Sequence, residues 1–88
     1  MLKMNNLKKC FDGAKVKNKR FVGVVIGMDG FPKPEVIINE ASNFDSKLAY
    51  YQKTYDEDLN HKFADGIKII GFAFGDSFQE IAFDLFGE

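Results

Sequence analysis

The sequence predicts a single small α+β domain with a three-stranded mixed sheet packed by amphipathic helices. Three observations carry this prediction: a length of 88 residues, short β-branched segments next to turn signals, and segments with helical apolar spacing. The predicted order is α-β-β-α-β-α. All of residues 1–88 belong to one domain, in which 1–20 form a basic N-terminal segment, with a short helix from about 4 to 12, and 21–88 form the core.

Three segments have the composition of strands. Residues 21–28 are rich in valine and isoleucine and are apolar on both alternating sets, which is typical of a strand covered on both faces. The turn signal Asp29-Gly30 separates them from a second strand at 35–39, so these two strands form a predicted hairpin with a loop of five or six residues. Residues 66–74 read as the third strand.

Residues 43–60 show the clearest helical pattern. The apolar positions follow steps of four, three, four and four residues: Phe44, Leu48, Tyr51, Tyr55 and Leu59. Ser42 and Asp45 resemble a capping arrangement at its start.

A last helix is predicted after Asp76-Ser77, where either residue can cap the helix N-terminus, and it ends near Gly87. Its expected buried stripe is Phe78, Ile81, Ala82, Leu85 and Phe86. Chain connectivity favours the strand order 2-1-3, with the third strand beside the first and parallel to the second.

Composition argues against several classes of protein. Apolar runs such as Val24–Ile26 are far shorter than the roughly 20 residues of a membrane-spanning helix. The first residues lack the apolar stretch of a signal peptide, so we expect a cytoplasmic location. The single cysteine, Cys10, cannot form an internal disulfide, and with one histidine it cannot complete a structural zinc site. No metal or cofactor is expected.

Aromatic residues are more numerous than a thin sheet needs. The chain has ten Phe and three Tyr, and each aromatic side chain buries roughly 150–250 Å² when enclosed. One interpretation is a core that closes over all of them. The other is an apolar surface for a protein partner or a second copy, which makes a homodimer the expected state. The candidate interface residues are Phe31, Phe72, Phe74, Phe83 and Phe86.

Charge is divided unevenly along the chain. Residues 1–20 carry seven Lys or Arg and one Asp, a net charge of +6, whereas residues 21–88 carry five Lys and twelve acids, a net charge of −7. Such a division indicates either a basic arm for nucleic acid or two surfaces that attract each other. The candidate nucleic-acid contacts are Lys8, Lys9, Lys15, Lys17, Lys19 and Arg20, with the alternating lysines of an extended 15–20 connector on one side.

Other motifs favour structural roles. Residues 71–77 run from a strand into a helix but lack the lysine of a phosphate-binding loop. Asp56, Glu57 and Asp58 read as a solvated helix end, and His61 has no identifiable catalytic partner. The chain is therefore not expected to be an enzyme.

The function predicted from these features is that of a small interaction or regulatory protein that acts through an aromatic-rich surface or self-association. The alternative is a nucleic-acid-binding accessory protein that uses the basic segment. Richness in Lys, Asn, Phe and Ile is typical of AT-rich genomes and favours an accessory protein of a bacterium or phage.

Overall fold

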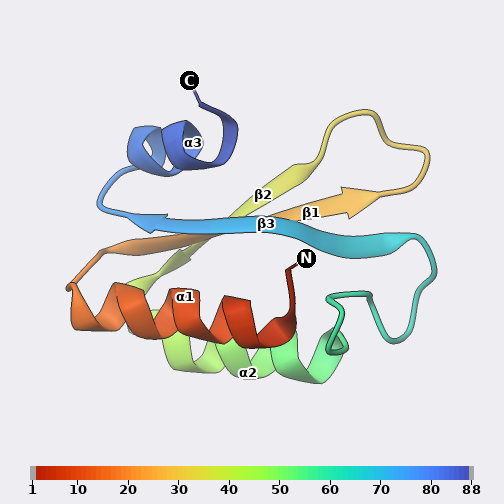
Figure 1. Cartoon of the computed structure of the whole chain (residues 1–88), viewed down its shortest axis with the longest axis horizontal. Helices are drawn as coiled ribbons and strands as arrows, with labels where there is room; N and C mark the ends of the chain where they lie inside the picture. The colour runs from red at the N-terminus through yellow and green to blue at the C-terminus, as the bar shows by residue number, and fades with distance from the viewer. Residues whose placement is uncertain (1, 88) are drawn as a thin grey trace.

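The computed structural model describes residues 2–87 and has the predicted α-β-β-α-β-α order (Figure 1). The helices are α1 (Met4–Val16), α2 (Phe44–Thr54) and α3 (Phe78–Phe86). The strands are β1 (Phe21–Met28), β2 (Glu35–Glu40) and β3 (Ile67–Gly75), and a short 3-10 turn, η1 (Ala41–Asn43), joins β2 to α2.

The three strands form one sheet with the predicted order β2-β1-β3. The prediction of a mixed sheet is wrong, because β1 pairs antiparallel with both β2 and β3. β3 does run in the direction of β2, as expected. However, the two strands flank β1 and never pair with each other, so no parallel ladder forms. A register shift between Val25 and Ile26 marks a bulge in the pairing of β1 with β3.

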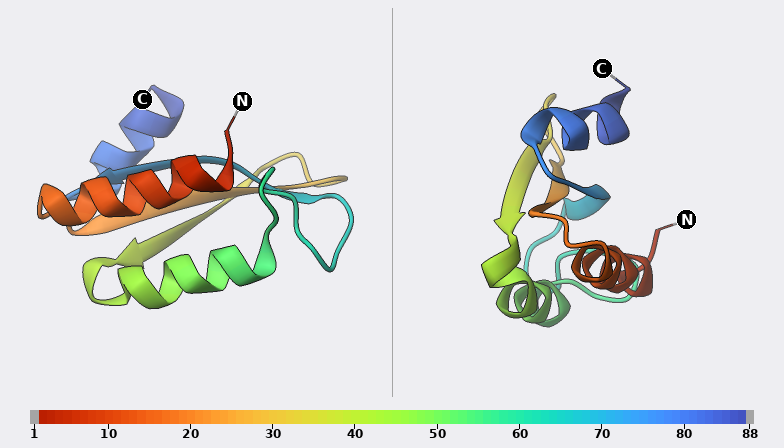
Figure 2. Two further views of the ribbon diagram at one scale, coloured as in Figure 1. Left: turned by 60° about the horizontal axis from the view of Figure 1, so that its bottom comes forward. Right: turned by 90° about the vertical axis from the view of Figure 1, so that its left-hand side faces the viewer.

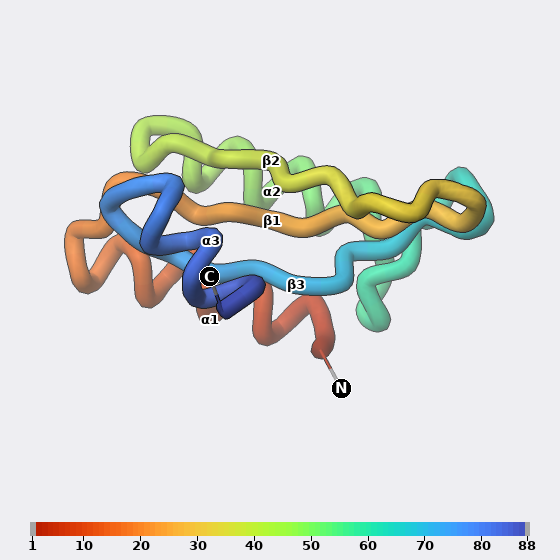
Figure 3. The backbone as a smooth tube through the Cα atoms, turned by 90° about the horizontal axis from the view of Figure 1, so that it is seen from above, coloured from red at the N-terminus to blue at the C-terminus, as the bar shows by residue number. Residues whose placement is uncertain are grey.

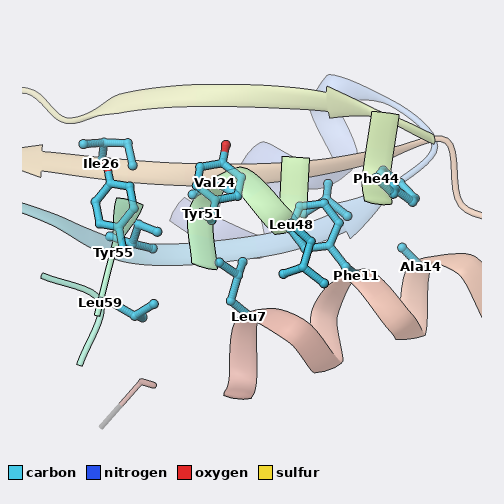
Figure 4. Close-up of a cluster of buried hydrophobic side chains, with 12 residues drawn as sticks. Leu7, Phe11, Ala14, Val24, Ile26, Phe44, Leu48, Tyr51, Tyr55 and Leu59 are labelled. Atoms are coloured by element: carbon cyan, nitrogen blue, oxygen red, sulfur yellow. The ribbon is translucent and has the colours of Figure 1, made fainter. Parts of the chain in front are cut away.

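The main core lies between one face of the sheet and the two helices α1 and α2 (Figure 2). α1 contributes Leu7, Phe11 and Ala14, all fully buried. The ring of Phe11 packs edge-on against Phe44 of α2, with the ring centroids 5.5 Å apart. Figure 4 shows these side chains meeting under the sheet. The N-terminal segment is therefore part of the hydrophobic core.

The buried Asn39 side chain forms hydrogen bonds that connect β2 with β1 and with α2. The Asn39 side chain on β2 donates to the carbonyl of Val22 on β1 at 3.0 Å. The Tyr51 hydroxyl of α2 donates to the Asn39 side-chain oxygen at 3.3 Å. Both side chains are about 1% exposed, so this pair meets the rule that buried polar groups are hydrogen-bonded.

α3 covers the opposite face of the sheet, mainly over β3 and to a lesser extent over β1 (Figure 3). It sits over glycines that leave room for it. A Cβ at Gly23 would lie 2.6 Å from Ile81 Cγ2, and a Cβ at Gly75 would lie 3.3 Å from Ile81 Cγ1. Because these positions lack side chains, Ile81 lies directly on the strands and is 1% exposed.

Two helix boundaries differ from the prediction. α1 runs through Asp12-Gly13 to Val16, because Ala14 packs into the core and the amphipathic pattern continues past the glycine. The left-handed Asn18 (φ 54°) then turns the chain, so residues 15–20 are not an extended connector.

α2 ends at Thr54, six residues before the predicted end, and it is not capped by the Ser42 side chain. The Asp56 carboxylate accepts the N–H groups of Asp58 and Asn60, which gives these groups partners outside a helix. Leu59 adopts a left-handed backbone (φ 68°) and is still fully buried. Apolar spacing alone could not separate this folded-back turn from a continuing helix.

Candidate protein-interaction surface

α3 leaves all three of its phenylalanine rings more than half exposed. Ser77 caps its N-terminus by accepting the Glu80 N–H at 3.1 Å, and Gly87 ends it in a left-handed conformation, as predicted. The predicted buried stripe is wrong in part, because only Ile81 is fully buried. Phe78 is 61% exposed, Phe86 51% and Phe83 62%. A helix on a sheet buries only the side that faces the strands, and these rings lie away from that side.

The three rings occupy one side and the outer surface of α3. Ile81 faces the strands, and Asp84 lies at the β3 edge, where it lines a groove with residues of α1 and β3. With 3.6 residues per turn, Phe78 and Phe86 then fall on the side of α3 opposite Asp84, with Phe83 on the outer crest. The ring of Phe78 also packs against Phe21 at the start of β1, with the ring centroids 5.2 Å apart.

The sheet surface near Ile81 is apolar as well. Val36 and Ile38 of β2 lie on the same face of the sheet, within 4 Å of a Cβ built at Gly23. Val36 is exposed and Ile38 is half-buried. We call this surface the aromatic face and define it by Phe78, Phe83, Phe86, Val36 and Ile38.

The five candidate interface residues do not form one surface. Phe83 and Phe86 lie on the aromatic face. Phe72 and Phe74 of β3 are half-buried and pack against the main core on the opposite side of the sheet. Phe31 lies in the β1–β2 loop and is 65% exposed. The structure therefore brings together two of the five.

The six candidate nucleic-acid contacts are also dispersed. Lys15 pairs with Asp45 of α2, and Lys8 pairs with Asp12 within α1 at 3.1 Å. Lys19 lies 3.4 Å from Asp76 and 4.0 Å from Glu80, at the start of α3. The basic segment thus contacts acids on α1, α2 and α3, which fits two surfaces that attract each other.

The other cations of this set contact aromatic rings or solvent. Lys17 Nζ lies 5.4 Å from the centroid of Phe74, and Arg20 Cζ lies 5.1 Å from that of Phe21. Lys9 is exposed and has no ion pair within residues 2–87. This arrangement does not present the six cations as one stripe along a nucleic-acid backbone.

The acidic residues after α2 have structural contacts. Asp58 pairs with Lys3, which lowers the pKa of the Asp58 carboxyl and raises that of the Lys3 amine through their hydrogen bond. Asp56 accepts the two backbone N–H groups of the turn. Within residues 2–87, no group of three or more His, Cys, Asp or Glu lies close enough to hold a metal ion.

A cleft of about 630 Å³ lies at the hairpin end of the sheet, between the β1–β2 loop and the loop before β3. Asp29, Phe31, His61 and Lys68 are among its lining residues. The His61 Nδ1 accepts the Phe63 N–H at 3.1 Å, and its ring packs edge-on against Tyr55. His61 is therefore engaged in holding this loop.

Cys10 is half-buried on α1. Burial raises the pKa of its thiol to about 11. A thiol with a raised pKa is a poor nucleophile at neutral pH.

Sequence reasoning missed Phe78, Val36 and Ile38 as surface residues. Phe78 directly follows the N-cap Ser77. This position could have indicated exposure, because the first turn of a helix often lies at the edge of the contact between the helix and a sheet. The exposure of Val36 and Ile38 depends on how far α3 reaches across the sheet. That reach is a tertiary property.

None of the helices within residues 2–87 is long and apolar enough to cross a membrane. Comparison with known protein families, with curated proteins and with solved structures finds no match to this chain.

Proposed function

We propose that this chain is a small, non-enzymatic interaction protein that forms a homodimer through its aromatic face. The observation that carries the proposal is the exposure of Phe78, Phe83 and Phe86 on a nine-residue helix that fully buries only Ile81. Contiguous exposed apolar surface of this kind usually marks a binding site.

The area of the aromatic face suits a dimer. A phenylalanine presents roughly 200 Å², so three rings that are 51–62% exposed offer about 350 Å² together. Val36 and Ile38 add to this. One side of a standard interface covers about 800 Å², of which a little over half is apolar, so it needs about 450 Å² of apolar surface. The aromatic face approaches that value.

The shape of the aromatic face also supports self-association. α3 forms a raised ridge with Phe83 at its crest, and the uncovered part of β2 beside it forms a lower floor. A twofold axis would set the ridge of each copy on the floor of the other, which is the self-complementary arrangement of a symmetric dimer. We further propose that the dimer acts in the cytoplasm as an accessory or regulatory protein of a bacterium or phage.

The test is size-exclusion chromatography with light scattering over a wide concentration range. Wild type is expected to form a dimer, and the double variant Phe83→Ser/Phe86→Ser is expected to be monomeric. Both rings are more than half exposed, so their removal leaves the fold intact. The matched control is Phe63→Ser, which removes a 78%-exposed ring in the loop before β3 and away from α3. This control is expected to remain a dimer.

Two results would contradict the proposal. One is a wild-type monomer up to about 1 mM, a concentration at which even a weak dimer of a few kcal/mol is populated. The other is a dimer that survives the double variant but dissociates in Phe63→Ser, because the interface would then lie at the hairpin end.

A further inference from the structure

The outer edge of β3 is covered over only half of its length. Residues 59–61 pair with its first half, where the Ile69 N–H donates to Leu59 at 2.9 Å and the His61 N–H donates to Ile67 at 2.9 Å. Beyond the bulge, the second half, residues 71–75, has no neighbouring strand on this side among the described residues 2–87. An uncovered strand edge is a ready template for another strand.

The direction of the free backbone groups follows from the ladder. The Arg20 carbonyl, just before β1, accepts the Ala41 N–H beside β2. Since backbone groups alternate between the two sides of a strand, even-numbered residues of β1 face β2 and odd-numbered residues face β3. The odd-numbered residues of β1 pair with Gly71, Ala73 and Gly75 of β3, so the backbone groups of these three residues face β1.

Phe72 and Phe74 therefore direct their N–H and C=O groups outward. Within residues 2–87, no hydrogen bond from another segment reaches these four groups. The segment Gly71–Gly75 also carries neither lysine nor proline, the residues that commonly protect an exposed edge.

A groove of about 350 Å³ runs along this edge. One wall is α1, with Asn6, Lys9 and Cys10, and the other is α3, with Asp84. The end-on view in Figure 2 shows α1 below β3 and α3 above it. An added strand would lie in the plane of the sheet with a helix on each side.

The two walls carry opposite charges. Lys9 and Asp84 are both exposed, and neither forms an ion pair within residues 2–87. Successive side chains of an extended strand point to opposite faces. A strand in this groove would therefore match both walls with an acidic residue toward Lys9 and a basic neighbour toward Asp84.

We propose that the β3 edge binds an extended peptide segment of a partner protein as a fourth strand, with an acidic and a basic residue at adjacent positions. The backbone groups of Phe72 and Phe74 supply the hydrogen bonds, and the two walls select the charges. This is the strand-addition mode of peptide recognition. It uses a different surface from the aromatic face and does not depend on dimerisation.

Charge disfavours a second copy of this chain as the occupant. Two β3 edges that pair antiparallel about a twofold axis keep their α3 helices on one face of the joined sheet and their α1 helices on the other. Like charges would then gather on each face, the two Asp84 carboxylates on one and the two Lys9 amines on the other, which is unfavourable. A peptide with an acidic and a basic residue at adjacent positions avoids this repulsion, because it places an opposite charge next to each wall.

The probe is a blocked hexapeptide, acetyl-Thr-Val-Glu-Lys-Val-Thr-amide, titrated into the ¹⁵N-labelled full chain and followed by NMR. The Phe72 and Phe74 amides are expected to exchange with solvent rapidly in the free protein, whereas the Gly71 and Ala73 amides are protected. Saturating peptide is expected to slow exchange at Phe72 and Phe74 at least tenfold. The control peptide has the same sequence with an N-methyl group on every residue, and it is expected not to bind because neither of its edges can donate to the ladder.

Charge variants test the walls without touching the core. Lys9→Glu and Asp84→Lys each leave both walls with the same sign and are expected to weaken binding about three- to fivefold, a typical effect of an exposed charge pair. The double variant K9E/D84K reverses both walls. The double variant is expected to regain the lost affinity. If the bound peptide shifts by one residue along β3, its Glu side chain moves to the face where its Lys side chain was, and the Lys side chain moves to the other face, so both again meet a wall of opposite charge.

Three results would overturn the proposal. The first is protection of the Phe72 and Phe74 amides in the free monomer. The second is equal binding of the N-methylated and unmodified peptides. The third is chemical-shift change confined to the aromatic face. The double variant Phe83→Ser/Phe86→Ser is measured in parallel and is expected to bind peptide like wild type, so failure of the dimer proposal would be seen separately from failure of this one.

Discussion

At the scale of single residues, the buried pair of Tyr51 and Asn39 contributes to the loss of stability at alkaline pH. Burial raises the pKa of the Tyr51 hydroxyl to about 12 from an ordinary value of 10.0. The unfolded chain therefore loses this proton first. The contribution of Tyr51 to stability is complete below pH 10 and is lost as the pH rises to about 12.

We predict that Tyr51→Phe lowers the free energy of unfolding at pH 7 by about 1–2 kcal/mol, because the buried Asn39 oxygen loses its donor. The same variant should lose less stability than wild type between pH 10 and 12. Part of the alkaline decline should remain, since burial also raises the pKa values of Tyr55 and Cys10. Urea unfolding at a series of pH values measures both effects.

The matched control for this prediction is Tyr50→Phe. Tyr50 is 51% exposed, and its hydroxyl makes no hydrogen bond within residues 2–87. This variant should unfold like wild type at pH 7. An equal loss in both variants, or an unchanged alkaline decline in Tyr51→Phe, would contradict the role given to the buried pair.

At the scale of elements, the position of α3 depends on the glycines beneath it. We predict that Gly23→Ala destabilises the protein by about 1–3 kcal/mol, the usual effect of overpacking, because its Cβ would lie 2.6 Å from Ile81 Cγ2. The control Gly71→Ala places a Cβ 3.6 Å from Leu85 and 3.7 Å from Val25, which are ordinary contacts. It should change stability little. Urea unfolding of both variants tests this, and equal stabilities would mean that α3 does not rest on β1.

The elements also separate what local sequence pattern can predict from what it cannot. The strands and the Ser77 and Gly87 ends of α3 follow from β-branched runs, turn residues and capping chemistry, all of which are local. The order 2-1-3 follows from chain connectivity. The end of α2 did not follow, because Asp56 and the left-handed Leu59 make a turn that keeps helical apolar spacing.

The candidate surface was predictable only in part. An excess of phenylalanine predicted exposed rings, and Phe83 and Phe86 are exposed on α3. Phe72 and Phe74 alternate with Ala73 on β3, so strand register decides on which face of the sheet the two rings lie. Both rings lie on the face that α1 and α2 cover, not on the face of α3. Which face the helices cover is decided by tertiary packing.

At the scale of the whole molecule, the uneven charge of the chain acts mainly within the fold. Cations of the N-terminal segment pair with acids of α2, of the turn after α2, and of the start of α3: Lys15 with Asp45, Lys3 with Asp58, and Lys19 with Asp76 and Glu80. Exposed pairs of this kind each contribute little to stability. The two surfaces proposed for binding, the aromatic face and the β3 edge, contain none of these paired residues.

These two surfaces predict different thermal behaviour. If the aromatic face forms a dimer, the unfolding midpoint must rise with protein concentration, because dissociation accompanies unfolding. A hundredfold increase should raise the midpoint by roughly 5–10 °C for a dimer of this size. Calorimetry should find this rise in wild type and Phe63→Ser and no rise in Phe83→Ser/Phe86→Ser. The hexapeptide should raise the midpoint of all three proteins, because the β3 edge is intact in each. A midpoint independent of concentration in wild type would contradict the dimer, whereas a midpoint unmoved by peptide would contradict strand addition.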